Sequence, residues 1–310
     1  SFSAPLRADA ANRQTGRFEG VAALPFEEAL NAARRLAREE RLRIGAQLLL
    51  GQATASEAGA AFADLADAAV AAMARAAEAE LARKHGAAPG PWAVLGLGKL
   101  GGRELSMDSD LDLMVVYDPD APQSLGDRPS GAEAWFVRFT QRLVSALSAP
   151  TEEGELYPVD MALRPSGSAG PIAVRLSRFA AYYDSDEAWT WERMALTRAR
   201  IVAGDLVEPL EAAVDAAIAK PVPAREIRAD AADMRARLLR DKPAKSPWDL
   251  KLRDGGLIEI EFIAQTAQLT VRRRAGARTR DALEALAAQG ALDQTRVAAL
   301  LEAEEDYAAL

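Results

Sequence analysis

The feature that most constrains the fold of this chain is a short segment, rich in glycine and aspartate, that joins two apolar runs. The runs, Pro91–Leu97 and Leu111–Tyr117, have the length and composition of buried β-strands. A βαβ crossover needs at least about 10–12 residues, including its helix. The candidate, Gly102–Asp110, is shorter and rich in residues that favour turns. The spacing therefore argues against a doubly wound α/β fold that begins with these two strands.

A dinucleotide-binding site is the first function that this spacing disfavours. Gly96, Gly98 and Gly101 match the pattern G-x-G-x-x-G, and Asp118 lies roughly where a ribose-binding acid is expected. That pattern has its structural meaning only when a full helix follows the glycines. A phosphate loop of the Walker A type is excluded, because the chain has no Gly-Lys-Ser or Gly-Lys-Thr sequence.

Two aspartates at the start of the second run point to metal chemistry. Asp110 and Asp112 are two residues apart, so a strand places both carboxylates on the same face. Adjacent carboxylates repel each other unless a cation lies between them, and ligand sets of oxygen atoms suit Mg²⁺ that also contacts substrate phosphates. The glycines before them allow backbone N–H groups to approach a phosphate chain. The segment therefore predicts a phosphate-binding metal site.

A third carboxylate, Asp160, is the candidate that would complete a two-metal site. It lies in a third apolar run, Leu156–Leu163, where an unpaired charge would be costly. Two divalent ions can activate an attacking oxygen and neutralise a departing pyrophosphate. The structural alternative is that Asp160 is the buried partner of an arginine.

Composition excludes several other classes. The net charge is −8 and no basic run stands out, which disfavours nucleic acid as a partner. The single histidine, His85, lies beside Gly86 in an expected linker, and the chain has no cysteine. Histidine-based hydrolase sites and thiolate metal sites are therefore not expected. No apolar window is long enough to span a membrane, so we expect a cytoplasmic protein.

Elsewhere the apolar spacing is mostly helical, which predicts an α+β protein. We expect a loop over residues 1–25, helices over 26–81 with breaks near Gly51 and Gly59, and a helix over 132–147. Further helices are expected near 176–184, 187–203, 224–240, 257–275, 280–289 and 292–310. These elements suggest three domains: residues 1–84, 85–220 and 221–310. The last helix carries no stop signal, so we expect the chain to continue in a longer protein.

At the level of motifs, the chain resembles the polymerase-β-like nucleotidyltransferases. Gly98-Lys99, followed by Ser109-Asp110-Leu111-Asp112, resembles their Gly-Ser…Asp-x-Asp signature, with lysine where serine is common. More specifically, Gly98–Leu105 and Ser109–Leu113 are similar to the glutamine synthetase adenylyltransferase family. The similarity extends from about residue 30 to the C-terminus through four further blocks, which are Asp160–Gly167, Glu187–Glu192, Leu196–Arg200 and Gly255–Phe262.

The resemblance implies a small mixed sheet, the nucleotidyltransferase core, flanked by N-terminal helices and a C-terminal helical bundle. It also implies transfer of AMP from ATP to a tyrosine hydroxyl of glutamine synthetase, with PII signalling protein and glutamine as regulators. The blocks Arg164–Gly167 and Ala188–Glu192 are more like the adenylylating half of the family. The alternatives are the adenylyl-removing half, which works by phosphorolysis, and a decayed transferase domain that binds a regulator.

The resemblance also assigns the site. Asp110, Asp112 and Asp160 would bind two Mg²⁺ ions, with Mn²⁺ as the alternative, and would be the catalytic residues. Residues expected to contact ATP are Gly98, Lys99, Gly101, Gly102, Ser109, Arg164, Ser166 and Gly167. For Lys99 a solvated side chain is the alternative, for Arg164 a structural ion pair, and for Ser166 and Gly167 a plain turn.

Three positions depart from the pattern of the family. Ala162 stands where arginine is common, and strand alternation would place it on the face of Asp160 and Arg164. Arg193 replaces a common histidine, and Glu259 replaces a common aspartate. The first departure removes an expected positive charge near the triphosphate.

Overall fold

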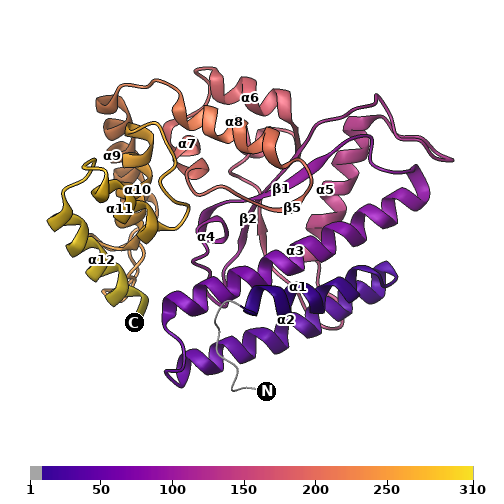
Figure 1. Cartoon of the computed structure of the whole chain (residues 1–310), viewed down its shortest axis with the longest axis horizontal. Helices are drawn as coiled ribbons and strands as arrows, with labels where there is room; N and C mark the ends of the chain where they lie inside the picture. Colours follow the sequence, from indigo (N-terminus) through magenta and orange to yellow (C-terminus); the bar gives the residue numbers. More distant parts are fainter. Residues whose placement is uncertain (1–8, 310) are drawn as a thin grey trace. The chain divides into compact units, whose positions relative to one another are not determined.

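The structure is a computed structural model that describes residues 9–309 (Figure 1). The chain divides into two compact units. The first contains residues up to 179 together with 200–210, and the second contains residues 180–199 and 211 onward. The chain therefore passes from one unit to the other after residues 179, 199 and 210. Each unit is described by itself below.

The first unit is built on a mixed sheet. Its strands are β1 (Trp92–Gly96), β2 (Leu111–Tyr117), β3 (Val159–Asp160), β4 (Ala173–Arg175) and β5 (Arg200–Gly204). The order is β3-β2-β1-β5, and β4 also pairs with β2. β1 is antiparallel to β2 and β5, whereas β2 is parallel to β3 and β4. The antiparallel pairing of β1 with β2 explains why so short a segment can join them.

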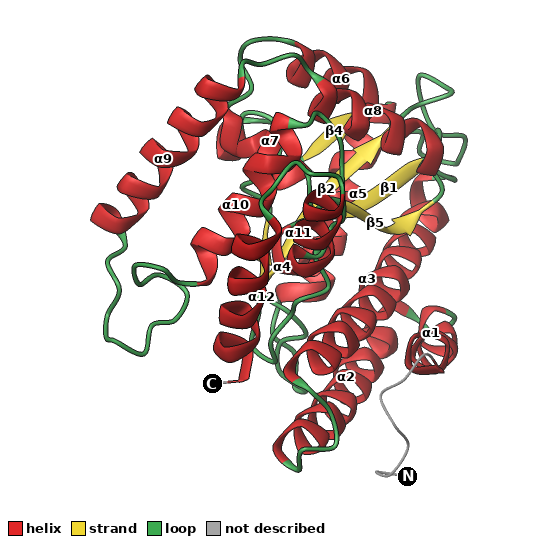
Figure 2. Cartoon of the chain, turned by 60° about the vertical axis from the view of Figure 1, so that its left-hand side comes forward, coloured by secondary structure: helices red, strands yellow, loops and turns green. Residues whose placement is uncertain are grey.

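Helices supply the rest of this unit. They are α1 (Asp9–Ala22), α2 (Phe26–Leu49), α3 (Ala55–His85), the short α4 (Gly98–Gly101) and α5 (Ala132–Ser148). α3 contacts α1, α2, α5 and β5, and Figure 2 shows it running alongside α2. Its many buried alanines allow this close packing, because a small side chain lets neighbouring backbones approach. A 3₁₀ turn, η1 (Gly167–Ala169), precedes β4.

Aromatic side chains of α5 fill the core between this helix and the sheet. Phe136 stacks on Tyr117 of β2 with ring centroids 4.2 Å apart. Phe139 lies 4.6 Å from the ring of Trp92 on β1, and Trp135 is stacked on Phe139. Such pairs contribute about 0.5–1.5 kcal/mol beyond their buried area, so they hold the sheet on α5 in one arrangement.

The second unit is helical. It contains α7 (Thr190–Leu196), α9 (Ala224–Asp241), α10 (Leu257–Thr270), α11 (Thr279–Ala288) and α12 (Gln294–Ala309). α6 (Leu176–Asp184) and α8 (Val207–Ala219) each begin in the first unit and end in the second. Ile260, Ala264, Leu283 and Val297 form a core shared by α10, α11 and α12. No helix in residues 9–309 is long and apolar enough to cross a membrane.

The expected α+β class and mixed sheet are confirmed, and most expected helices are present. The bounds of β2 agree with the expected strand to the residue, and α6, α9 and α11 lie within a residue of their expected ranges. The break near Gly51 is confirmed by a turn between α2 and α3. Residues 1–8, part of the expected N-terminal loop, lie outside the described range.

Several expectations of secondary structure are wrong. Residues 9–22 form α1 rather than a loop, and α3 runs through Gly59 without a break. A single glycine inside a helix costs only about 1 kcal/mol, so the packing of a long helix outweighs it. Residues 200–203, expected to end the helix 187–203, instead lie in β5, because this segment pairs with the edge of β1 that faces away from β2. β4 and α8 were not predicted, and His85 ends a helix rather than lying in a linker.

Candidate active site

The centre of the candidate site is the contact between Gly98 and Asp112. β1 and β2 are antiparallel, with Gly96 paired to Leu113, so the end of β1 meets the start of β2. Leu97 N donates to Asp112 O at 2.9 Å, and the chain then turns through Gly98 at a φ of +51°. A Cβ at Gly98 would lie 2.0 Å from Asp112 Oδ2. Glycine is therefore required here both by the backbone angle and by the carboxylate packed against it.

Asp160 lies on the strand next to Asp112. β3 is parallel to β2, and Asp112 and Asp160 are register partners. Neighbouring strands are about 4.7–4.9 Å apart, so the two carboxylates start from adjacent positions. Asp160 is exposed, and its Oδ1 accepts a hydrogen bond of 2.6 Å from Ala162 N.

The expected environment of Asp160 is wrong. β3 has two residues instead of the eight expected over 156–163, and the chain turns directly after Asp160. Asp160 is therefore not a buried charge, and the alternative of a buried ion pair does not apply either. The alternation argument for Ala162 and Arg164 also fails, because both residues lie in a turn.

Asp110 directly precedes β2 and is exposed. Before it, residues 106–109 form a turn in which Ser109 Oγ accepts from Ser106 N at 3.0 Å and shares a hydrogen bond of 2.7 Å with Ser106 Oγ. The Ser109 hydroxyl therefore takes part in the turn that positions Asp110. The sequence predicts that Ser109 contacts ATP, whereas in the structure its hydroxyl has a structural role.

The three carboxylates suit a divalent cation, both in their chemistry and in the strand positions from which they extend. Three carboxylates provide only oxygen ligands, which Mg²⁺ and Mn²⁺ accept. The side chains as they stand do not gather, since no group of three acidic or histidine side chains in residues 9–309 could hold a metal ion. Within residues 9–309, Oδ2 of Asp160 finds no hydrogen-bond partner, and neither does the carboxylate of Asp110. Binding a cation would require side-chain rotation but no change in strand pairing.

The glycine loop, defined here as residues 97–104, has the hydrogen bonds of a single helical turn. Gly101 N donates to Leu97 O at 2.8 Å, Gly102 N to Gly98 O at 3.1 Å, and Glu104 N to Lys99 O at 2.9 Å. The ammonium group of Lys99 forms no hydrogen bond or ion pair with the described part of the chain. The loop thus gathers the predicted phosphate contacts Gly98, Lys99, Gly101 and Gly102 beside Asp112.

Two arginine ion pairs hold the glycine loop against α3. The aspartate partners of these arginines were not predicted from the sequence. Arg103 pairs with Asp64 at 2.7 Å, and Arg200 pairs with Asp67 through two bonds of 2.6 and 2.9 Å. Burial raises the pKa of Asp67, while the hydrogen bond and charge of Arg200 oppose that rise. Burial alone would lower the pKa of Arg103, but its bond to Asp64 and the nearby charges raise it.

The loop from Met161 to Pro171 is folded around Arg164. Its guanidinium donates to the carbonyl oxygens of Met161, Ser168, Gly170 and Pro171 at 2.6–3.4 Å. Ser166 and Gly167 have φ angles of +64° and +55°, which produces the expected turn. Burial lowers the pKa of Arg164, and the charge of Asp160 acts in the opposite direction. Arg164 shapes this loop, and its expected contact with ATP stays a prediction.

The three departures from the family pattern have identifiable surroundings. Ala162 is exposed next to Asp160. Arg193 is buried and donates to the carbonyl oxygens of Tyr183 and Ser185 at 3.2 Å. Glu259 accepts from Arg235 at 2.8 Å within the second unit. The last two side chains are therefore used in helix packing.

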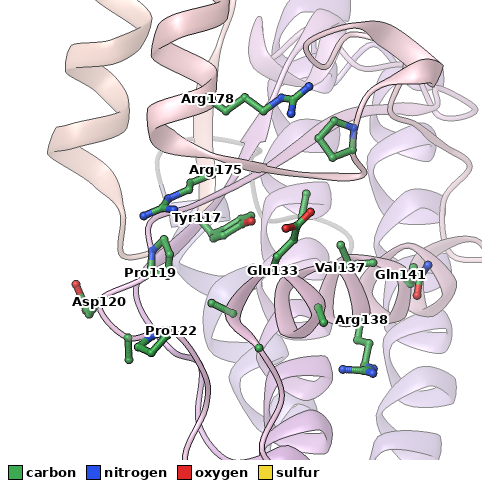
Figure 3. A pocket seen from close by; sticks show the side chains of 16 residues that line it. Tyr117, Pro119, Asp120, Pro122, Glu133, Val137, Arg138, Gln141, Arg175 and Arg178 are labelled. Atoms are coloured by element: carbon green, nitrogen blue, oxygen red, sulfur yellow. The ribbon is translucent and has the colours of Figure 1, made fainter.

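A pocket of about 1170 Å³ opens at the other end of β2 (Figure 3). Tyr117 ends β2, Arg175 ends β4, and Glu133 lies in the first turn of α5; all three line the pocket. Burial raises the pKa of Tyr117, as does the charge of Glu133, whereas Arg175 lowers it. None of the predicted site residues lines this pocket, and Asp110 and Asp112 lie at the opposite end of β2.

Comparison with known proteins identifies the family. The model of the glutamate-ammonia ligase adenylyltransferase family matches residues 5–215. A second model, described as GlnD PII-uridylyltransferase, matches residues 225–310. The first match includes the glycine loop, the three aspartates and the whole sheet.

Curated relatives agree with the first match. A bifunctional glutamine synthetase adenylyltransferase/adenylyl-removing enzyme of Mesorhizobium japonicum is 46% identical over 84% of this chain and 27% of the relative. The enzymes of the same name in Caulobacter vibrioides and Bartonella quintana are 46% and 41% identical over 85% and 90% of the chain. The chain spans 27–29% of the length of these three relatives. The chain belongs to the glutamate-ammonia ligase adenylyltransferase family.

Proposed function

We propose that this chain transfers AMP from ATP to a tyrosine hydroxyl of glutamine synthetase and releases pyrophosphate. The observation that carries the proposal is the packing of the Asp112 carboxylate against Gly98, with Asp160 in register on the next strand. This arrangement brings a carboxylate pair to a turn of backbone that a phosphate chain can approach closely. The names of the curated relatives support the reaction and its protein substrate.

In the proposed reaction the hydroxyl oxygen attacks the α-phosphorus of ATP. A new oxygen–phosphorus bond forms, and the bond from the α-phosphorus to the oxygen that bridges to the β-phosphorus breaks. The proton of the hydroxyl passes to one of the nearby carboxylates, Asp110, Asp112 or Asp160. Lys99, which has a free ammonium group, would bind the β- or γ-phosphate and so favour departure of pyrophosphate.

The metal ions belong to the proposal as well. Asp110, Asp112 and Asp160 would hold one or two divalent cations, Mg²⁺ or Mn²⁺. When bound, such ions stabilise negative charge on the α-phosphate and on the leaving pyrophosphate. Backbone N–H groups at the start of the glycine loop, those of Gly98 and Lys99, would orient the nucleotide together with the Ser166–Gly167 turn, Ser109 and Arg164. Holding the reactants in one geometry is itself a large part of catalysis in phosphoryl transfer.

Labelling of glutamine synthetase with ATP that carries label in its α-phosphate tests the proposal. We expect Mg²⁺-dependent transfer by the wild-type chain and a loss of about 100- to 1,000-fold in Asp112→Asn, since several kcal/mol of charge stabilisation are removed. Asp108→Asn is the matched control. Asp108 lies in the turn of residues 106–109 that precedes β2, where its carboxylate accepts a hydrogen bond of 3.2 Å from Ser106 Oγ. Transfer that persists in Asp112→Asn would reject the assigned site.

The same assay distinguishes the opposite direction of the reaction. A wild-type chain that does not label glutamine synthetase, yet releases the adenylyl group of the modified protein as ADP when phosphate is added, would be the adenylyl-removing form. Nucleotide binding with neither reaction would point to a decayed transferase. Each result replaces the proposed direction but leaves the family assignment unchanged.

We further propose PII signalling protein and glutamine as regulators and the cytoplasm as the place of action. The match of residues 225–310 to the GlnD PII-uridylyltransferase model supports a role for α9–α12 in contact with PII. A chain without cysteine depends on no disulfide and is suited to a reducing compartment. Calorimetric titration of the chain with PII, with and without glutamine, measures this contact, and an absence of heat in both titrations would reject it.

A further inference from the structure

Two acidic side chains interrupt the apolar surface of α3 close to the glycine loop. In residues 61–70 of this helix, Asp64 and Asp67 are the positions that are not buried. They are three residues apart and therefore lie on one face of the helix, where two carboxylates repel each other. Each carboxylate is paired with an arginine from a distant part of the sequence. The pairs are Asp64 with Arg103 and Asp67 with Arg200.

The first pair fixes the end of the glycine loop. Arg103 Nη1 lies 2.7 Å from Asp64 Oδ1, and the side chain of Asp64 is only 12% exposed. Arg103 has a φ of +57°, a left-handed conformation that is unfavourable for a residue with a side chain. The ion pair stabilises this conformation, because it holds the side chain in the direction that the left-handed backbone gives it.

The second pair fixes the middle of the loop. Arg200 binds both oxygens of Asp67, and its Nη2 also donates to Leu100 O at 3.0 Å. Arg200 is the first residue of β5 and is paired with Gly96, the last residue of β1. The guanidinium group of Arg200 therefore joins α3 to the Leu100 carbonyl of α4, while the backbone of Arg200 pairs with the strand that precedes the loop.

Close backbone packing accompanies the two pairs. A Cβ at Gly59 of α3 would lie 3.4 Å from Leu105 O, directly after the loop. A Cβ at Gly45 of α2 would lie 2.6 Å from Met107 Cε. At Gly59 a Cβ would be in ordinary van der Waals contact, and at Gly45 it would meet the flexible end of Met107, so both helical positions lie directly beside the segment after the loop. The loop is thus held by ion pairs at two points and supported by backbone just beyond.

We propose that Asp64 and Asp67 are positioning residues for the nucleotide, acting through Arg103 and Arg200 on the glycine loop. Neither carboxylate is placed among the groups that contact ATP. Their effect on catalysis would come from the position of Gly98 relative to Asp112, which depends on the loop. The inference about catalysis rests on the proposed function, whereas the inference about loop order does not.

Hydrogen exchange without nucleotide is the first test. We expect the amides of Gly101, Gly102 and Glu104 to exchange about tenfold faster in Asp67→Asn, which corresponds to about 1.4 kcal/mol of lost local stability. Asp64→Asn should accelerate mainly Glu104, near Arg103. The matched control is Glu153→Gln, which removes a half-buried carboxylate paired with Arg35 and Arg38. Unchanged exchange over 97–104, or equal acceleration throughout the sheet, would overturn the proposal.

Steady-state kinetics is the second test. In Asp67→Asn we expect the KM for ATP to rise about tenfold with a smaller change in kcat, and in Glu153→Gln neither to change. A protein that is only less stable loses active molecules and lowers apparent kcat without raising KM. Failure of the wild-type chain to use ATP would reject the proposed function, while the exchange experiment would still decide the role of the two aspartates. If Asp67→Asn does not fold, Asp64→Asn tests the proposal at the end of the loop, through the exchange of Glu104 and the KM for ATP.

Discussion

At the scale of single residues, the site depends most on the absence of a side chain at Gly98. Gly98→Ala would place a methyl group 2.0 Å from Asp112 Oδ2 on a backbone with a φ of +51°. We expect AMP transfer to fall on the order of 100-fold, as a misplacement of about 1 Å can do, while the fold is kept. The labelling assay and far-UV circular dichroism measure the two effects. Gly20→Ala is the control, because Gly20 lies within α1 and a Cβ there would have no atom within 4 Å. Equal activity in both variants would contradict the prediction.

Glu192 provides a prediction about pH. It is 2% exposed and accepts from Trp189 N and from Tyr182 OH. Burial raises its pKa above the ordinary value of 4.5, although these hydrogen bonds and the charge of Arg193 oppose the rise. Between the ordinary and the raised pKa the folded state binds more protons than the unfolded state. The free energy of unfolding therefore falls as pH rises through that window.

Glu192→Gln should remove that part of the pH dependence. The free energy of unfolding of the variant, relative to the wild type, is expected to increase as pH rises above 4.5 and then to become constant. Urea titrations at a series of pH values measure this difference. Glu187→Gln, at a nearby exposed position, should give a curve parallel to the wild type. A parallel curve for Glu192→Gln would show that the buried carboxylate does not titrate in this way.

At the scale of secondary structure, α3 begins with a capping box. Glu57 N donates to Thr54 Oγ1 at 3.2 Å, and Thr54 N donates to Glu57 Oε2 at 2.9 Å. We expect Thr54→Ala to lower the free energy of unfolding by about 1 kcal/mol, which is the usual effect of losing such a cap. Thermal unfolding should show a decrease of about 2–4 °C for a unit of this size. Thr54→Ser, which keeps the hydroxyl, should stay near the wild type, and an equal decrease in both variants would contradict the cap.

The same scale shows how far the sequence predicts this fold and this site. β2 is predicted to the residue because an apolar run with glycine and aspartate on one side has a single interpretation. β5 is not predictable from residues 200–204 alone, since its strand conformation comes from pairing with β1 more than 100 positions earlier. The closeness of Asp112 to Gly98 follows from local spacing, whereas the register of Asp160 depends on a strand of two residues. The one sequence signal for Asp64 and Asp67 is that two acidic residues lie three positions apart in an alanine-rich helix.

At the scale of the whole molecule, each unit has a core of its own. Phe139 is fully buried in the first unit, and Leu283 is fully buried in the second. We expect Phe139→Ala and Leu283→Ala to cost about 3–5 and 2–5 kcal/mol, respectively. Hydrogen exchange should then increase in the sheet and α5 for the first variant, and in α10–α12 for the second. An equal increase throughout the chain in both variants would show that the two cores unfold together.

The return of residues 200–210 to the first unit sets a limit on how the chain can be shortened. A fragment that stops at residue 179 contains all three aspartates yet lacks the fifth strand. It would leave one side of β1 with unpaired N–H and C=O groups, a surface prone to edge-to-edge aggregation. It would also remove Asp205, whose carboxylate accepts from Trp92 N at 3.2 Å. A fragment meant to contain the candidate site should therefore extend to at least residue 210, even though the three predicted acidic ligands all lie before residue 161.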